Sequence, residues 1–106
     1  MEKKAVVRIL DRLRREIEHR GIKPQRIILY GSYVTGANVK GSDIDVVIIS
    51  SDFATKSYWE RIDILADAIY EVSAPVEAVA MTPEEWESGD SFLVEFARNG
   101  EVLFAV

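Results

Sequence analysis

The sequence feature that most constrains the fold is the apolar run at residues 44–50, IDVVIIS, in which five of seven residues are β-branched and apolar. Such a run predicts a buried strand, and it is the clearest strand in the chain. Three further short apolar stretches bounded by turn residues also predict strands. They are 26–31 (RIILYG), 75–81 (PVEAVAM) and 101–106 (EVLFAV). A central sheet of about four strands is therefore expected.

Helical periodicity separates these strands. Apolar residues at helical spacing predict an amphipathic helix over about 3–20, which Gly21 and Pro24 would end. A second helix is expected over about 56–72, with one apolar face turned to the core. That face holds Trp59, Ile62, Leu65, Ala66 and Ile69.

Three shorter helices are expected. One lies within SYVTGAN (32–38), directly after the first strand. Another opens at TPEEW (82–86), where Thr82 and Glu85 have the spacing of a capping box and Pro83 suits the first turn. A third starts near Asp90 and covers SFLVEFAR. Helices and strands alternate, which predicts one α/β domain over residues 1–106, with an N-terminal helix at about 3–20 and a core from about 25.

Composition sets limits on compartment and partners. The chain of 106 residues has no cysteine, which excludes disulfides and thiolate metal sites and fits a reducing cytoplasm. No apolar run is long enough to cross a membrane, and the N-terminus lacks the pattern of a signal peptide. We expect a cytoplasmic protein without a membrane partner. A domain this small buries limited surface, so a homo-oligomer is possible.

The charges are unevenly placed along the chain. Residues 1–30 hold nine of the thirteen Lys and Arg but four of the eighteen Asp and Glu. This asymmetry indicates either a polyanionic or acidic partner, or a solvated helix face. Direct binding of nucleic acid is the weaker interpretation, because the first helix lacks interleaved aromatic residues and the net charge is −5.

Two carboxylates stand at the start of the clearest strand. Asp43 and Asp45 are two residues apart, so on a strand their side chains point to the same face, while Ile44 and Val46 point to the other. Like charges at this distance repel unless a cation lies between them. Oxygen ligands without nearby Cys or His favour Mg²⁺, with Mn²⁺ possible. Because Mg²⁺ is usually shared with substrate phosphates, a phosphate site should be close.

Gly31 and Ser32 are the candidate for that phosphate site. A strand that ends in Gly-Ser before a turn exposes backbone N–H groups and a hydroxyl, which suit phosphate. A Gly-Ser turn or an Asp-x-Asp pair alone is common. The two together, ten residues apart and each beside a buried strand, form a more specific pattern.

The run YGSYVTGANVKGSDIDV resembles the signature of the polymerase-β-type nucleotidyltransferase superfamily. It is most similar to the minimal nucleotidyltransferase (MNT) proteins, stand-alone domains of about this length. The resemblance implies a mixed sheet flanked by helices. It implies that Gly31 and Ser32 contact the nucleotide and that Asp43 and Asp45 hold two metal ions. It also implies a third carboxylate on a later strand, where Glu77 stands; Glu77 is otherwise an edge-strand residue that faces water.

This chain departs from the family pattern at two places. The third carboxylate is usually Asp, and the segment after Gly-Ser often carries an arginine, whereas SYVTG has none. The cation that faces the triphosphate would then come from Lys40, from the first helix or from a partner.

The resemblance implies transfer of AMP from ATP to a hydroxyl of a partner protein. MNT proteins typically pair with HEPN-domain proteins in toxin–antitoxin modules, where the MNT member is the antitoxin. The alternative is a binding module that neutralises its partner by contact alone.

Overall fold

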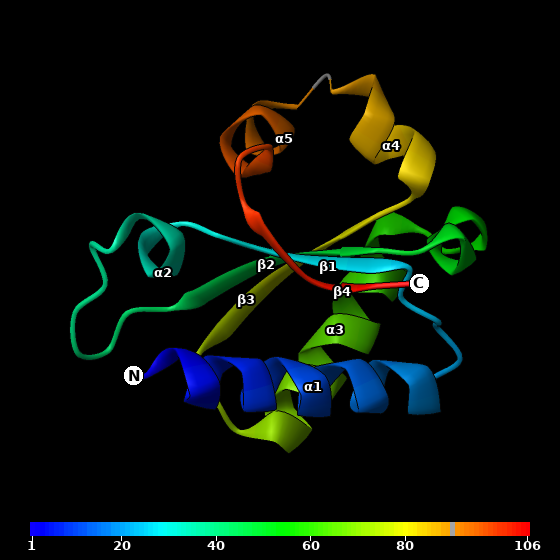
Figure 1. The fold of residues 1–106 in the computed structure, drawn as a ribbon. Helices are drawn as coiled ribbons and strands as arrows, with labels where there is room; N and C mark the ends of the chain where they lie inside the picture. Colours follow the sequence, from blue (N-terminus) through cyan, green and yellow to red (C-terminus); the bar gives the residue numbers. More distant parts are fainter. Residues whose placement is uncertain (90) are drawn as a thin grey trace.

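A four-stranded mixed sheet runs through the middle of the molecule, with helices on both faces (Figure 1). The computed structural model describes residues 1–89 and 91–106. The strands are β1 (Arg26–Tyr30), β2 (Ile44–Ile49), β3 (Val76–Met81) and β4 (Glu101–Ala105), in the spatial order β3-β2-β1-β4. β1 pairs antiparallel with both β2 and β4, and β2 pairs parallel with β3. The predicted α/β fold and its four strands are confirmed.

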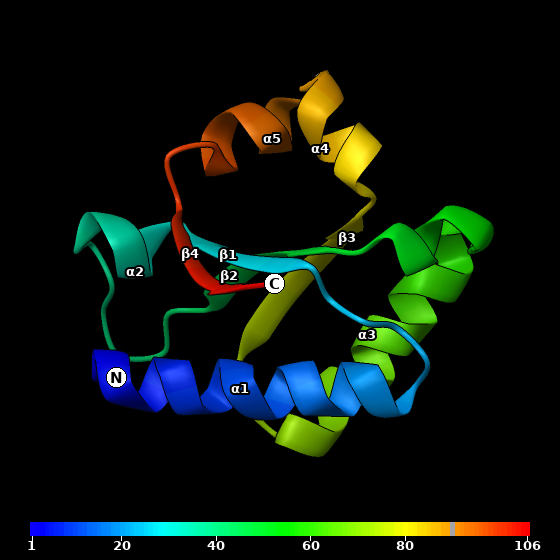
Figure 2. The same ribbon diagram turned by 45° about the vertical axis from the view of Figure 1, so that its right-hand side comes forward.

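Two long helices cover one face of the sheet. They are α1 (Lys3–His19) and α3 (Tyr58–Val72), which lie together below the sheet in Figures 1 and 2. α1 buries Val6, Leu10, Leu13 and Ile17, the face that its helical periodicity predicts. Against them pack inward residues of β1 and β2, among them Leu29, Val46 and Ile48, in the larger of two apolar clusters.

Shorter helices lie on the opposite face. α4 (Pro83–Ser88) and α5 (Phe92–Ala97) cover a second, smaller cluster that includes Ile28, Val47 and Ile49. The capping box predicted for α4 is confirmed: Thr82 Oγ1 accepts from Glu85 N at 3.1 Å, and Glu85 Oε1 accepts from Thr82 N at 2.8 Å. Asp90, where the last helix was expected to start, lies outside the described residues, and Ser91 is the N-cap of α5.

α3 differs from its prediction at its start and on one face. Residues 51–55 form a separate 3₁₀ helix, η1 (Ser51–Thr55), and α3 begins only at Tyr58 because Ser57 caps it in a capping box with Glu60. The residues of α3 that are buried are Leu65, Ala68 and Val72. Trp59, expected in the core, is 70 % exposed. The buried face of α3 is therefore rotated by about a quarter-turn about the helix axis from the predicted face. The reason is that α3 carries two adjacent apolar faces, and only one of them packs in the core.

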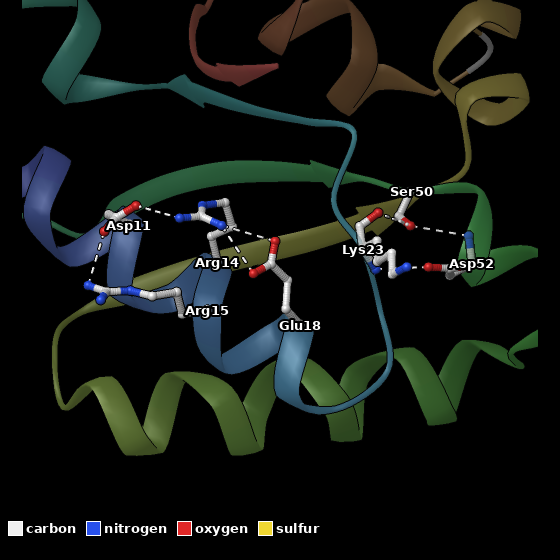
Figure 3. A network of polar contacts seen from close by, with 7 residues as sticks. All are labelled: Asp11, Arg14, Arg15, Glu18, Lys23, Ser50 and Asp52. Carbon is white, nitrogen blue, oxygen red and sulfur yellow. Dashed lines mark hydrogen bonds and ion pairs between the residues drawn. The ribbon is translucent and has the colours of Figure 1, made fainter. Parts of the chain in front are cut away.

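Most of the basic residues of α1 for which partners are recorded pair within the helix. Arg14 contacts Asp11 at 2.8 Å and Glu18 at 3.0 Å, and Arg15 contacts Asp11 at 3.0 Å (Figure 3). Beside them, the buried Ser50 hydroxyl donates to the Lys23 carbonyl at 2.7 Å and fixes the entry into β1. These pairs favour a solvated helix face as the reason for the basic N-terminal segment. Among the described residues, no helix has both the length and the apolar character needed to cross a membrane.

Candidate active site

The sheet register brings three candidate site residues into one row. Tyr30, the last residue of β1, pairs with Asp45 of β2, and Asp45 pairs with Glu77 of β3. Residues opposite one another in adjacent strands share a face of the sheet. Tyr30 belongs to the cluster under α4 and α5, so the row lies on that face, away from α1 and α3. It forms one end of the sheet, where β1 ends and β2 and β3 begin.

Asp45 is the most perturbed carboxylate in this row. Burial, together with a hydrogen bond shared with Glu77 and the negative charges of Glu77 and Asp43, raises the pKa of Asp45 to about 6. The same neighbourhood acts on the phenol: burial, followed by the charges of Asp45 and Glu77, raises the pKa of Tyr30. Excess negative charge gathered in a half-buried place is the electrostatic condition that a bound cation would relieve.

Gly31 leaves the space that the Asp45 carboxylate fills. Its φ of 78° and ψ of −150° lie in a region that only glycine adopts readily. A Cβ on Gly31 would stand 2.5 Å from Asp45 Oδ2 and 3.3 Å from Asp45 Cγ. Any side chain at this position would push the carboxylate away from the end of β1. The glycine of the Gly-Ser pair is therefore required by the position of Asp45 as well as by the turn.

Ser32 opens the short helix α2 (Ser32–Thr35) directly after Gly31. The amides of Val34 and Thr35 donate to the Gly31 carbonyl at 3.0 and 3.1 Å, which closes the turn. Within the part of the chain that the structure describes, the Ser32 hydroxyl makes no hydrogen bond. The turn thus places Ser32 directly after Gly31, whose backbone lies against the Asp45 carboxylate.

Asp43 stands apart from the other two carboxylates. It is exposed and lies one residue before β2 begins. The sequence pattern predicts Asp43 and Asp45 as neighbours on one strand, but only Asp45 belongs to β2. Its charge still reaches Asp45. Among the described residues, no group of three carboxylate or imidazole side chains is gathered closely enough to hold a metal as it stands. The structure brings Asp45 and Glu77 together and leaves Asp43 at the rim.

Glu77 has the strand geometry that its period-two pattern predicts. Val76 of β3 is buried in the larger apolar cluster. Glu77, the next residue, points to the opposite face of the sheet, which carries Asp45, and is exposed. The donors at this place are hard oxygens, and their crowded charge fits a divalent cation such as Mg²⁺ better than a softer metal.

Tyr30 is a candidate site residue that the motif did not identify. Its place opposite Asp45 follows from the β1–β2 register, and its ring packs edge-to-face against Phe96 of α5, with centroids 6.1 Å apart. The alternation of side chains along a strand predicts which face of the sheet Tyr30 points to, but it does not predict that Asp45 lies opposite Tyr30. Tyr33, by contrast, is partly buried against the larger cluster, which supports a packing role.

The sequence offers two places in this chain that could supply a cation to face the triphosphate, the first helix and Lys40. The fold places them differently relative to the carboxylate row. α1 packs against the other face of the sheet, so its basic residues do not line the carboxylate row. Lys40 is exposed in the loop between α2 and β2, which leads directly to Asp43.

Comparison with solved structures finds the same architecture in several proteins. A candidate nucleotidyltransferase from Sulfolobus solfataricus aligns with a TM-score of 0.67 and 12 % identity, over 91 % of this chain and 77 % of that one. A toxin–antitoxin complex solved with AMP-PNP contains a chain with a TM-score of 0.65 and 22 % identity, over 91 % of this chain and 73 % of that one. A mutant of the toxin–antitoxin complex MntA-HpeT contains a chain with a TM-score of 0.61 and 19 % identity, over 100 % of this chain and 75 % of that one. These likenesses show the fold.

Comparison with sequences gives the family. No curated protein matches the chain. A sequence model of the nucleotidyltransferase domain matches residues 10–99, which include the Gly-Ser turn, both aspartates and Glu77. The match covers most of the chain and confirms the resemblance read from the motif. The chain belongs to the nucleotidyltransferase domain family and is a nucleotidyltransferase.

Proposed function

We propose that this chain transfers AMP from ATP to a hydroxyl group of a partner protein and releases pyrophosphate, with Mg²⁺ as cofactor. The observation that carries the proposal is the row Tyr30–Asp45–Glu77 beside Gly31. Two carboxylates, Asp45 and Glu77, stand opposite each other there, and the pKa of Asp45 is raised to about 6. Perturbed carboxylates next to a phosphate-binding turn are typical of sites that act on nucleotides.

Each residue has a role in this proposal. Asp43, Asp45 and Glu77 would hold two Mg²⁺ ions, for which Mn²⁺ can substitute, and the bound metal would neutralise charge on the attacking and leaving oxygens. Asp43 would reach the metals by a turn of its exposed side chain. Glu77 holds the acceptor side of the site and takes up the hydroxyl proton. The Ser32 hydroxyl and the backbone around Gly31 hold the triphosphate.

Solved structures with the same fold support the proposal of a partner protein. Toxin–antitoxin complexes, one with AMP-PNP, contain chains with this fold. We infer that this chain, a single domain over residues 1–106, is the antitoxin of such a pair, that it acts in the cytoplasm, and that a HEPN-domain toxin supplies the acceptor hydroxyl.

The test is a transfer assay with purified components. The wild-type chain is incubated with ATP labelled on the α-phosphate, Mg²⁺ and the protein encoded by the neighbouring gene. Label is expected on the partner, and Asp43→Asn, Asp45→Asn and Glu77→Gln should each reduce it by at least about 100-fold. Glu84→Gln, an exposed carboxylate on α4, is the matched control and should transfer normally.

A second arm tests the geometry of the turn. Gly31→Ala should displace the Asp45 carboxylate and abolish transfer, whereas Gly36→Ala should retain it, because a Cβ on Gly36 meets no atom within 4 Å although its φ is also positive, at 84°. Calorimetric titration of both variants with Mg²⁺ and ATP measures how much affinity for the nucleotide Gly31→Ala loses relative to Gly36→Ala. A wild type that binds and silences the partner without transferring AMP would contradict the enzymatic proposal and establish the contact-only alternative.

A further inference from the structure

α5 carries two exposed aromatic side chains, although its other side packs in the core. Phe92 is 87 % exposed and Phe96 is 61 % exposed. Val94 and Ala97 of the same helix are buried in the smaller cluster. Because four residues advance a helix by about 40° beyond a full turn, the two phenylalanines lie along the same side of α5. Aromatic rings that lie side by side in water are typical of places where a ligand or a partner binds.

Phe96 joins this side of α5 to the candidate active site. Its ring meets the Tyr30 ring edge-to-face, with centroids 6.1 Å apart and an interplanar angle of 80°. Tyr30 directly precedes Gly31 and stands opposite Asp45 in the sheet register. In Figures 1 and 2, α5 lies on the face of the sheet away from α1 and is nearer to α2 than α4 is. The exposed rings therefore continue the surface that the Gly-Ser turn and the carboxylate row form.

The aromatic surface of α5 is small. Phe92 and Phe96 are the exposed apolar residues of this helix, and the exposed residues beside them, Ser91, Glu95 and Arg98, are polar or charged. One aromatic side chain buries roughly 150–250 Å² when it is fully covered. Each partner in a stable protein complex buries about 800 Å². Two rings are thus too little for a protein interface of ordinary size, but they are enough to cover one flat group of a small molecule.

A nucleoside triphosphate bound at the proposed phosphate site would bring such a group with it. One ribose separates the base from the phosphates, so the base must lie close to the residues that hold the phosphates. Those residues are Gly31 and Ser32 in the proposed function, and Tyr30, which contacts Phe96, directly precedes them. Aromatic side chains hold bases by stacking, and each stacked base adds substantially to affinity.

We propose that Phe96, with Phe92 beside it, is the surface on which the base of the nucleotide stacks. The proposal rests on the proposed function for the identity of the ligand as a nucleoside triphosphate. Tyr30 meets the Phe96 ring and positions it, and the exposed part of that ring takes the base. Stacking accepts every base, because every base has a π-face. The two rings therefore add affinity for ATP and for GTP alike.

Calorimetric titration in the presence of Mg²⁺ tests the stacking by comparing ATP with inorganic tripolyphosphate, which has phosphates and no base. Phe96→Leu keeps an apolar side chain and removes the ring. It should weaken ATP binding at least about fivefold and leave tripolyphosphate binding unchanged. Phe96→Tyr keeps the ring and should bind ATP as the wild type does. Addition of Phe92→Leu to Phe96→Leu should weaken ATP binding further.

A matched control and a metal-site variant frame this comparison. Tyr70→Leu removes an aromatic ring that is 83 % exposed on α3, behind the sheet, and should bind both ligands with wild-type affinity. Asp45→Asn should weaken the binding of both ligands together, because it would act on the phosphates through the metal. Only loss of the Phe96 ring should separate ATP from tripolyphosphate.

Photolabelling of the wild type with 8-azido-ATP locates the base without any substitution. Label is expected on α5, and excess ATP should suppress it. Label confined to other elements would overturn the proposal, and so would unchanged ATP affinity in Phe96→Leu. Equal loss of ATP and tripolyphosphate affinity, in a variant that melts at the wild-type temperature, would also overturn it. Weaker binding of the partner protein with unchanged ATP affinity would assign the two rings to the partner instead.

This proposal and the proposed function fail in different ways. If the wild type binds ATP through Phe96 and transfers no AMP, the base site stands and the proposed function is wrong. If the wild type transfers AMP and Phe96→Leu binds ATP with wild-type affinity, the function stands and the base site is wrong.

Discussion

Asp45 is held in an environment that opposes its charge. It is half-buried, and the residues opposite it in the sheet register are Tyr30 and Glu77, neither of which is a cation. Residues that bind or catalyse are often unfavourable for stability in this way, because the same site must remain ready for a ligand. The absence of a side chain at Gly31 leaves room for the Asp45 carboxylate and so decides where that carboxylate lies.

Removing the charge of Asp45 should stabilise the protein without metal. The folded-state pKa is about 6, above the ordinary value of 3.8, so the folded protein keeps a proton that the unfolded chain releases. Asp45 therefore lowers stability progressively as the pH rises from about 4 to above 6. Asp45→Asn should raise the melting temperature at pH 7 by about 2–5 °C.

Thermal unfolding between pH 4 and 8 in the presence of a chelator checks this prediction. The difference between Asp45→Asn and wild type should shrink toward pH 4. Asp63→Asn, an exposed carboxylate on α3, is the control and should show no such gain. A lower melting temperature for Asp45→Asn at pH 7 would contradict the electrostatic account.

At the scale of elements, helix ends are where local sequence and tertiary contacts meet. Glu85 completes the capping box of α4 and also accepts from Arg61 Nη1 of α3 at 2.7 Å. Arg61 in turn lies over the Phe53 ring, 5.8 Å from its centroid. One carboxylate thus caps α4 and ties it to α3.

Loss of the Thr82 hydroxyl should destabilise the fold. Thr82 is 5 % exposed, and its Oγ1 accepts the Glu85 amide at 3.1 Å. Thr82→Ala should reduce the free energy of unfolding by about 1–2 kcal/mol, because the Glu85 amide in the first turn of α4 loses its hydrogen-bond acceptor. Thr82→Ser keeps the hydroxyl and should lose less than half as much. Urea unfolding measures both, and equal losses in the two variants would show that the methyl group, not the cap, stabilises α4.

At the scale of the whole molecule, the two faces of the sheet have different roles. α1 and α3 bury the larger cluster, while the opposite face carries the smaller cluster and the carboxylate row. Stability and site chemistry are therefore partly separable. A cavity under α1 should weaken the fold without reshaping the site.

Leu13→Ala tests this separation. Leu13 is fully buried at the centre of α1, and its truncation should lower the free energy of unfolding by about 2–5 kcal/mol. Val7→Ala on the same helix, where the side chain is 43 % exposed, should lose under about 1 kcal/mol. Below the unfolding transition, Leu13→Ala should bind Mg²⁺ and ATP with wild-type affinity in calorimetry. A tenfold loss of that affinity would show that the two faces are coupled.

Much of the fold follows from local patterns. The strands 26–31 and 44–50, the helix at 3–20 and the capping box at Thr82 are confirmed because each is set by residues close together in the chain. The face of α3 is different. Its apolar residues cover more than half of the helix, so periodicity offered two interfaces and only packing against β3 decided between them.

The sequence by itself determined the family and predicted the Gly-Ser turn and the aspartate pair, since a motif within 15 residues needs no long-range contact to be read. Only the tertiary structure decided that Tyr30 and Glu77 flank Asp45, that Asp43 stays at the rim and that α1 lies behind the site. The physical reason is register: strand pairing joins residues more than 30 positions apart, and a shift of one residue would turn each of these side chains to the other face.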